Sequence, residues 1–210
     1  MSQQIIGIDF SINSTAIAVR KGESLNLFSF VPNYKATLSG FKTHEAIKDL
    51  VHISSYQKGS NIKDPMVDQS TKLKNADALS DSIIEAIGSE IDSPKIYIEG
   101  FSFGSKGNSF IDLVTFNTFL KVKMIQKWGH VINVVPPKTI KKSYTGNGNA
   151  SKCDMLRKYM ESGEGPFKEK LIELGLNREE DFVIPKPIDD LIDAIALTEI
   201  FVDLEVTGEN

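Results

Sequence analysis

Short apolar segments alternate with amphipathic ones along the chain. Three segments rich in Ile, Ala, Val and Phe near the amino terminus predict strands over residues 4–10, 14–20 and 25–31. The tight turns between them are typical of an antiparallel meander. Two later apolar runs, at 95–101 and 131–135, each follow a helical stretch, so we expect them to join the sheet as parallel strands.

In other stretches the apolar residues recur every three or four positions, which predicts amphipathic helices. Ser93-Pro94 and Gly129 are suited to end two of them, and Ser151 is suited to cap a third. The expected helices cover residues 71–91, 109–128, 152–161, 168–174 and 189–204, with a short one beginning near 138. The pattern therefore predicts an α/β fold with a mixed five-stranded sheet, three antiparallel strands followed by two parallel ones, flanked by helices.

Residues 32–69 interrupt this order, because prolines and glycines break them up and little periodicity is left. A short helix around 42–50 and one more strand near 51–56 are compatible with the pattern. We therefore predict a single domain over residues 1–210 with an insertion at about 32–69.

The composition excludes several classes of protein. With 40% hydrophobic and 25% charged residues among 210, the chain can bury a sizeable core. The single cysteine, Cys153, excludes an intramolecular disulfide framework and a cysteine-based zinc site. The start lacks a signal-like segment, and no apolar run is long enough to span a membrane. We expect a soluble cytoplasmic protein with no membrane partner.

Charge is strongly segregated along the chain, although the net charge is only −4. Residues 121–158 hold nine Lys or Arg and one acid, whereas residues 159–210 hold four Lys or Arg and fourteen acids. A basic stripe beside carboxylates suits a metal-dependent enzyme that acts on phosphodiesters. A solvated basic face next to an acidic helix end explains the same pattern equally well.

Carboxylates stand at the ends of two predicted core strands and at the start of the last helix. Asp9 and Glu99 end apolar strands, and Asp190 and Asp193 share one face of a helix. Taken singly, the two helical residues are explained by the helix dipole, and Asp189 by an N-cap or an exposed position. Together the four would repel one another unless cations held them, and their oxygen ligands suit Mg²⁺ or Mn²⁺.

The motifs around these carboxylates resemble those of the RuvC-like Holliday-junction resolvases, which belong to the ribonuclease H-like superfamily. The resemblance runs in order over most of the chain and leaves about residues 32–69 uncovered. The matching pieces are Ile-Gly-Ile-Asp9, Tyr-Ile-Glu99, Val-Pro-Pro-Lys-Thr-Ile-Lys-Lys142, Thr-Gly-Asn-Gly-Asn-Ala-Ser-Lys152 and Asp190-Leu-Ile-Asp193-Ala.

The resemblance implies a ribonuclease H-like fold, a homodimer and cleavage of branched DNA with two metal ions. The catalytic residues and metal ligands that it implies are Asp9, Glu99, Asp190 and Asp193, which would hold two Mg²⁺ ions, with Mn²⁺ able to substitute. Lys152 would stabilise charge near the scissile phosphate.

The resemblance also implies a set of DNA contacts. Lys152 and one of Lys141 or Lys142 would contact the phosphate backbone, with Lys138 beside them. An aromatic residue shortly after Glu99 would stack on a base. Phe101 and Phe103 straddle that position, and either is equally compatible with a place in the core.

The chain also departs from the family. Phe116, Phe119 and Lys121 replace the small residues of the family's dimer helix. With the insertion and the acidic carboxyl-terminal part, they indicate a divergent branch, such as one from a bacteriophage.

Several functions are compatible with these features. The first is an endonuclease that resolves Holliday junctions or other branched DNA, and the second is a nuclease of the same fold that cuts flaps or RNA–DNA hybrids. A third, from another class, is an actin-like or sugar-kinase-like ATP-binding protein, because Asp9-Phe-Ser-Ile-Asn-Ser-Thr15 resembles a first phosphate loop. That class needs a second phosphate loop, which we do not find in the sequence. A fourth is a binding protein that keeps the fold without catalysis, against which the presence of all four acids counts.

Overall fold

A mixed sheet forms the centre of the computed structural model, which describes residues 3–32, 38–57, 64–88, 91–101, 108–129 and 132–200. Its strands lie in the order β4-β3-β2-β1-β5-β6. The three amino-terminal strands pair antiparallel, and the other neighbouring pairs are parallel. The strands are β1 (Gln4–Asp9), β2 (Thr15–Lys21), β3 (Ser24–Pro32), β4 (Val51–Tyr56), β5 (Lys95–Glu99) and β6 (Ile132–Val135).

The predicted fold class is confirmed, with one strand more than the five expected. The additional strand is β4, which lies within the predicted insertion and extends the sheet beyond β3. Buried and exposed residues do not alternate along β4. The sequence of this strand therefore lacks the period of two that predicts a half-buried strand.

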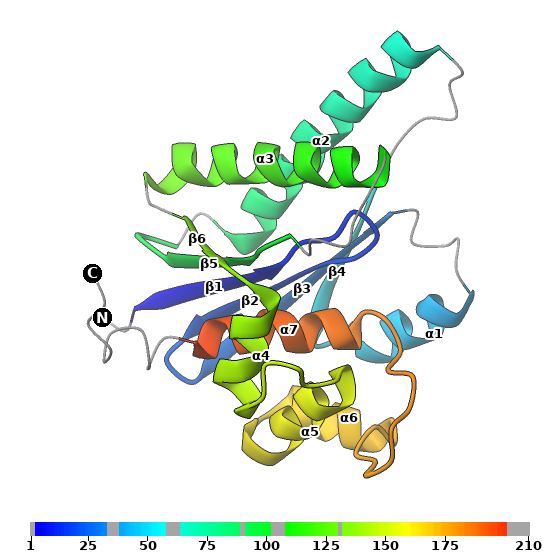
Figure 1. Cartoon of the computed structure of the whole chain (residues 1–210), viewed down its shortest axis with the longest axis vertical. Coiled ribbons are helices and arrows are strands. Elements are labelled where there is room, and N and C mark those ends of the chain that lie inside the picture. The colour runs from blue at the N-terminus through cyan, green and yellow to red at the C-terminus, as the bar shows by residue number, and fades with distance from the viewer. Residues whose placement is uncertain are drawn as a thin grey trace.

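Helices cover both faces of the sheet (Figure 1). On one face lie α2 (Pro65–Ile87) and α3 (Asn108–Trp128), and on the other lies α7 (Ile188–Glu199), with a group of short helices beyond it. In the described ranges no helix is long and apolar enough to cross a membrane. The remaining helices are α1 (Leu38–Ile47), α4 (Pro137–Thr145), α5 (Lys152–Ser162) and α6 (Pro166–Glu173).

Most predicted helix ends agree with the observed ones, and the exceptions have local causes. The helix expected from residue 71 begins earlier, at Pro65, because the Asp64 side chain caps it by accepting from the Met66 and Val67 N–H groups. The last helix ends at Glu199, and the rest of its predicted range, 201–204, lies outside the described residues.

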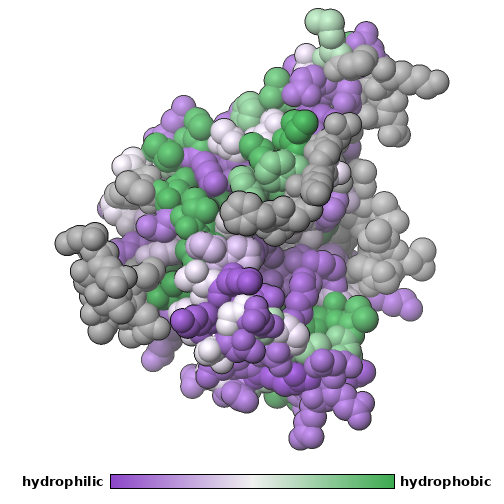
Figure 2. Space-filling model, in the orientation of Figure 1, coloured by the Kyte–Doolittle hydropathy of each residue, from purple (hydrophilic) through white to green (hydrophobic). Residues whose placement is uncertain are grey.

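The alternation of side chains along the strands divides the core into two layers. Ile6, Ile8 and Ile98 point toward α2 and α3 and belong to one apolar cluster. Tyr97 points to the other face and belongs to the cluster that α7 shares with α4, α5 and α6. The outer surface of α4–α6 is predominantly hydrophilic (Figure 2).

The approach of α7 to the sheet depends on Gly7 in the middle of β1. A β-carbon on this residue would lie 2.2 Å from the Ala194 carbonyl oxygen and 2.9 Å from the Leu197 β-carbon. Helix and strand are therefore in backbone contact at this point, which no side chain larger than hydrogen allows.

We expect Gly7→Ala to lower the free energy of unfolding by about 3 kcal/mol, because α7 must move away from β1. Urea denaturation followed by circular dichroism measures this change. Gly100→Ala is the matched control, since its β-carbon would have no neighbour closer than 3.4 Å. Equal losses in the two variants would contradict the importance of the contact.

Candidate active site

Asp9 and Glu99 lie side by side at the ends of β1 and β5. These strands are parallel, and their register pairs Ile8 with Ile98, so the next residues are neighbours about 4.8 Å apart across the sheet. Both acids fall on the same face as Gly7 and Tyr97, which is the face covered by α7. The strand alternation thus aims both carboxyl groups at this helix.

Asp190 and Asp193 approach from α7, whose buried residue Ala194 contacts Gly7. Asp190 is 3% exposed and Asp193 is partly buried. Because Gly7 lies two residues before Asp9, the backbone contact fixes the distance between this helix turn and the strand ends. The structure therefore brings the four predicted carboxylates together, although they come from three distant parts of the chain.

The electrostatics of these groups show how crowded they are. Burial, repulsion by Glu99 and Asp190, and a hydrogen bond donated to Glu99 raise the pKa of Asp9 well above its usual value. Burial and repulsion by Glu99 raise the pKa of Asp193 to about 7 against the opposing effect of Lys152, and burial together with Asp189 raises the pKa of Asp190. The cluster carries more negative charge than its surroundings compensate.

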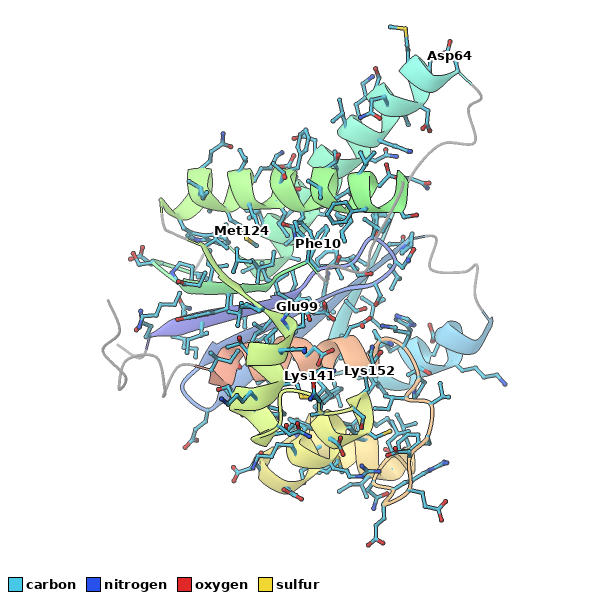
Figure 3. All side chains as sticks on the ribbon, viewed as in Figure 1. Phe10, Asp64, Glu99, Met124, Lys141 and Lys152 are labelled. Carbon is cyan, nitrogen blue, oxygen red and sulfur yellow. The ribbon has the colours of Figure 1, made fainter. Side chains whose placement is uncertain are left out.

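Two lysine amines supply the compensation that is present. Lys186 contacts Asp190 and also lies 3.0 Å from an Asp189 oxygen. Lys152 pairs with the same Asp189 oxygen, and its amine is 3.9 Å from Asp190. Two acids at the start of α7 are thus bridged by two amines. Figure 3 labels Lys152 and, at the end of β5, Glu99.

Asp189 and Lys186 were not anticipated as parts of this site. Asp189 is 5% exposed, so its expected role as an N-cap or an exposed neighbour is wrong, and Pro187 takes the N-cap position. Lys186 stands four residues before Asp190 but precedes the start of α7, so the spacing rule for charge pairs on a helix gave no signal for their contact. The contact between Asp189 and Lys152 spans 37 positions and likewise left no signal.

The loop between α4 and α5 presents Lys152. Ser151 and Asp154 form a capping box at the start of α5. The Lys141 amine donates to the Ala150 carbonyl at 2.8 Å, and Gly146 ends α4 in the left-handed conformation. Lys141 is thus bound to its own loop.

The other predicted DNA contacts are placed differently. Lys138 and Lys142 are exposed on α4. Phe101 is partly buried and packs edge-on against Phe110, with the Lys121 amine 5.4 Å from its ring centre. Phe103 lies outside the described residues. Base stacking by either phenylalanine stays a prediction.

The turn from β1 to β2 brings Ser14 close to Asp190. Ser14 is 5% exposed and approaches Asp190, whose pKa it lowers, without closing a hydrogen bond of good geometry. The Tyr56 hydroxyl donates to the Ile12 carbonyl at 2.6 Å and so ties the turn to the end of β4. A strand within the predicted insertion thereby supports the turn that follows Asp9.

The four carboxylates are suitable ligands for a divalent metal ion, although their side chains are not arranged around a single point. In the part of the chain that the structure describes, no three His, Cys, Asp or Glu side chains already converge as ligands. The carboxylate oxygens are hard donors, burial and mutual repulsion raise the pKa values of Asp9, Asp190 and Asp193, and the buried Asp190 Oδ2 has no hydrogen-bond partner. Shifts of these side chains would bring a cation the oxygen ligands that it needs.

The sheet order, the helices on both faces and the carboxylates at the ends of β1 and β5 define a ribonuclease H-like fold. The yeast mitochondrial Holliday junction resolvase Ydc2 shares this fold, which confirms the resemblance at the level of the fold.

One comparison with a solved structure supports the fold, at low sequence identity. The yeast mitochondrial Holliday junction resolvase Ydc2 is similar at 12% identity, with a TM-score of 0.51 over 95% of this chain and 77% of that one. RuvC of Thermus thermophilus is 14% identical, with a TM-score of 0.49 over 98% and 97% of the chains. The same enzyme in complex with a Holliday junction substrate gives 0.48. No family model and no curated protein sequence matches the chain.

We expect Asp193→Asn to stabilise the metal-free protein at pH 8. The folded-state pKa of Asp193, about 7, exceeds its ordinary value of 3.8, so ionisation costs stability increasingly as the pH rises from about 4 to about 7. Removing the charge should recover on the order of 1 kcal/mol at pH 8 and little at pH 4. Thermal unfolding in EDTA at both pH values measures this.

Asp181→Asn is the control, because Asp181 pairs with Arg157 on the surface. An Asp193→Asn variant that is less stable than the wild type at pH 8 would show that the carboxylates do not repel one another.

Proposed function

We propose that the protein is a metal-dependent, structure-selective endodeoxyribonuclease that resolves Holliday junctions or other branched DNA. The observation that carries the proposal is that Asp9, Glu99, Asp190 and Asp193 lie near enough to repel one another, beside the Lys152 amine. The resolvase-like fold is consistent with it. Such an enzyme would act in the cytoplasm of a bacterial or phage-infected cell.

The four carboxylates would hold two Mg²⁺ ions, with Mn²⁺ able to substitute. When bound, such ions supply an activated water and stabilise the leaving oxygen of a phosphodiester. The protein's own contribution begins with orientation, because β1, β5 and α7 hold the acids on rigid elements.

The basic residues would bind and polarise the DNA backbone. The Lys152 side chain is half exposed, so its amine is available to a phosphate oxygen while it contacts Asp189. Lys138 and Lys142 are exposed on α4 and would add phosphate contacts without reading sequence. Because substrate choice lies in loops, a flap or an RNA–DNA hybrid is the alternative substrate for the same site.

We expect the wild type to cut a synthetic four-way junction in Mg²⁺ or Mn²⁺ faster than flap, hybrid or linear substrates. Asp9→Asn should abolish cleavage while leaving the fold and junction binding nearly unchanged, because the amide cannot replace an anionic ligand. Gel-resolved cleavage, circular dichroism and fluorescence anisotropy measure the three properties.

Glu23→Gln is the control, since Glu23 lies in the exposed β2–β3 turn, at the end of the strands opposite to Asp9. An Asp9→Asn variant that cuts as fast as this control would refute the active-site assignment. Preference for the hybrid or the flap would redirect the proposal to that substrate.

We also propose a homodimer, because resolving a junction requires cuts in two strands. An apolar surface is available on α3, where Ile111, Val122 and Ile125 are each about half exposed. Sedimentation equilibrium should give twice the mass of the chain, and Ile125→Glu should shift it toward the monomer. Glu23→Gln again serves as the control. A monomer at micromolar concentration would contradict the proposal.

A further inference from the structure

We propose that Asp189 is a positioning residue that holds the Lys152 amine at the catalytic carboxylates. The inference rests on the proposed nuclease function. It assigns a role to a side chain that is not among the four predicted ligands.

The first argument is the contrast in exposure between the two partners. The Asp189 side chain is 4% exposed, whereas the Lys152 side chain is 52% exposed. The buried Asp189 carboxylate therefore pairs with a Lys152 side chain that is still exposed to solvent. This arrangement differs from a buried structural ion pair, in which both partners are withdrawn from water.

The second argument is that one oxygen of Asp189, Oδ2, faces two amines, while its buried Oδ1 has no hydrogen-bond partner among the described residues. Its Oδ2 contacts Lys152 and lies 3.0 Å from the Lys186 amine. Lys186 also pairs with Asp190, so it balances the charge of both neighbours on α7. The Asp189 Oδ2 thus accepts from Lys152 and faces a second amine, although the side chain is buried.

The third argument is that both ends of the contact are fixed. On the side of α5, the Ser151 capping box and the bond from Lys141 to Ala150 set the start of the helix. The Cys153 thiol donates to the Phe182 carbonyl and accepts from its N–H, which joins this helix to the segment before α7. On the other side, Ile188 and Leu191 of α7 are fully buried.

These contacts lead to a specific geometry for Lys152. An ammonium group has three N–H donors, and one is directed to Asp189. The amine lies 3.9 Å from Asp190, so it is held beside the carboxylate cluster with its remaining donors free for a phosphate oxygen. A flexible four-carbon side chain is thereby oriented before DNA binds, which favours the transition state over the ground state.

A double-mutant cycle tests the inference, with Lys152→Gln, Asp189→Asn and the double variant. Single-turnover cleavage of the four-way junction is measured at saturating Mg²⁺, and junction binding is measured by anisotropy in Ca²⁺. Asp189→Asn should slow cleavage about 10- to 100-fold, as for residues that orient a catalytic group, and change the dissociation constant less than about 3-fold. In the Lys152→Gln background it should slow cleavage less than about 3-fold further, because its target is gone.

Asp181→Asn is the matched control, since Asp181 also pairs with a basic residue of α5, Arg157, but on the surface. It should leave the cleavage rate unchanged in both backgrounds. If the effects of Asp189→Asn and Lys152→Gln multiply, or if excess Mg²⁺ restores the Asp189→Asn rate, Asp189 acts independently of Lys152 and the inference is overturned.

Asp189→Glu provides a second route if the asparagine variant does not fold. It keeps the charge but displaces the carboxylate by one methylene, so it should slow cleavage only when Lys152 is present. An equal effect in the Lys152→Gln background would overturn the inference. If the wild type cuts none of the substrates, the proposed nuclease function is wrong. That result differs from a failure of the Asp189 inference, in which the wild type cuts the junction but the variants do not behave as expected.

Discussion

The backbone contact between Gly7 and Ala194 is the constraint on which the rest of the site depends. It sets the depth at which α7 lies under the sheet, and it does so two residues from Asp9 and one residue from Asp193. Side chains in a packed core leave some freedom of position, whereas a carbonyl oxygen pressed against a glycine leaves almost none. The spacing between the carboxylates of the strands and those of the helix is therefore set by main-chain atoms.

Charge balance is the second constraint, and it opposes the first. Asp9, Glu99, Asp189, Asp190 and Asp193 face two amines, which leaves an excess of three negative charges when all are ionised. Two divalent cations and one phosphodiester would neutralise that excess. Packing thus holds together groups that electrostatics drives apart, a conflict typical of sites whose geometry serves chemistry rather than stability.

The fold and the carboxylates were readable from the sequence because both follow local rules. A period of two along β1 and β5 places Asp9 and Glu99 on one face, and a spacing of three does the same for Asp190 and Asp193. Asp189 was misread, because an aspartate beside a helix start looks like a cap unless its long-range partner is known. The position of β4 and the contact of Phe101 with α3 likewise depend on tertiary packing that no local pattern encodes.

The bond from the Tyr56 hydroxyl to the Ile12 carbonyl changes how the insertion is understood. A segment that interrupts the family resemblance is structurally joined to the turn behind the first carboxylate. The Ile12 carbonyl accepts its hydrogen bond from Tyr56, which lies outside the shared motifs. A displacement of β4 would therefore displace the turn as well. Relatives without this strand must support the same turn by another route, and sequence differences in the two segments should accordingly be inherited together.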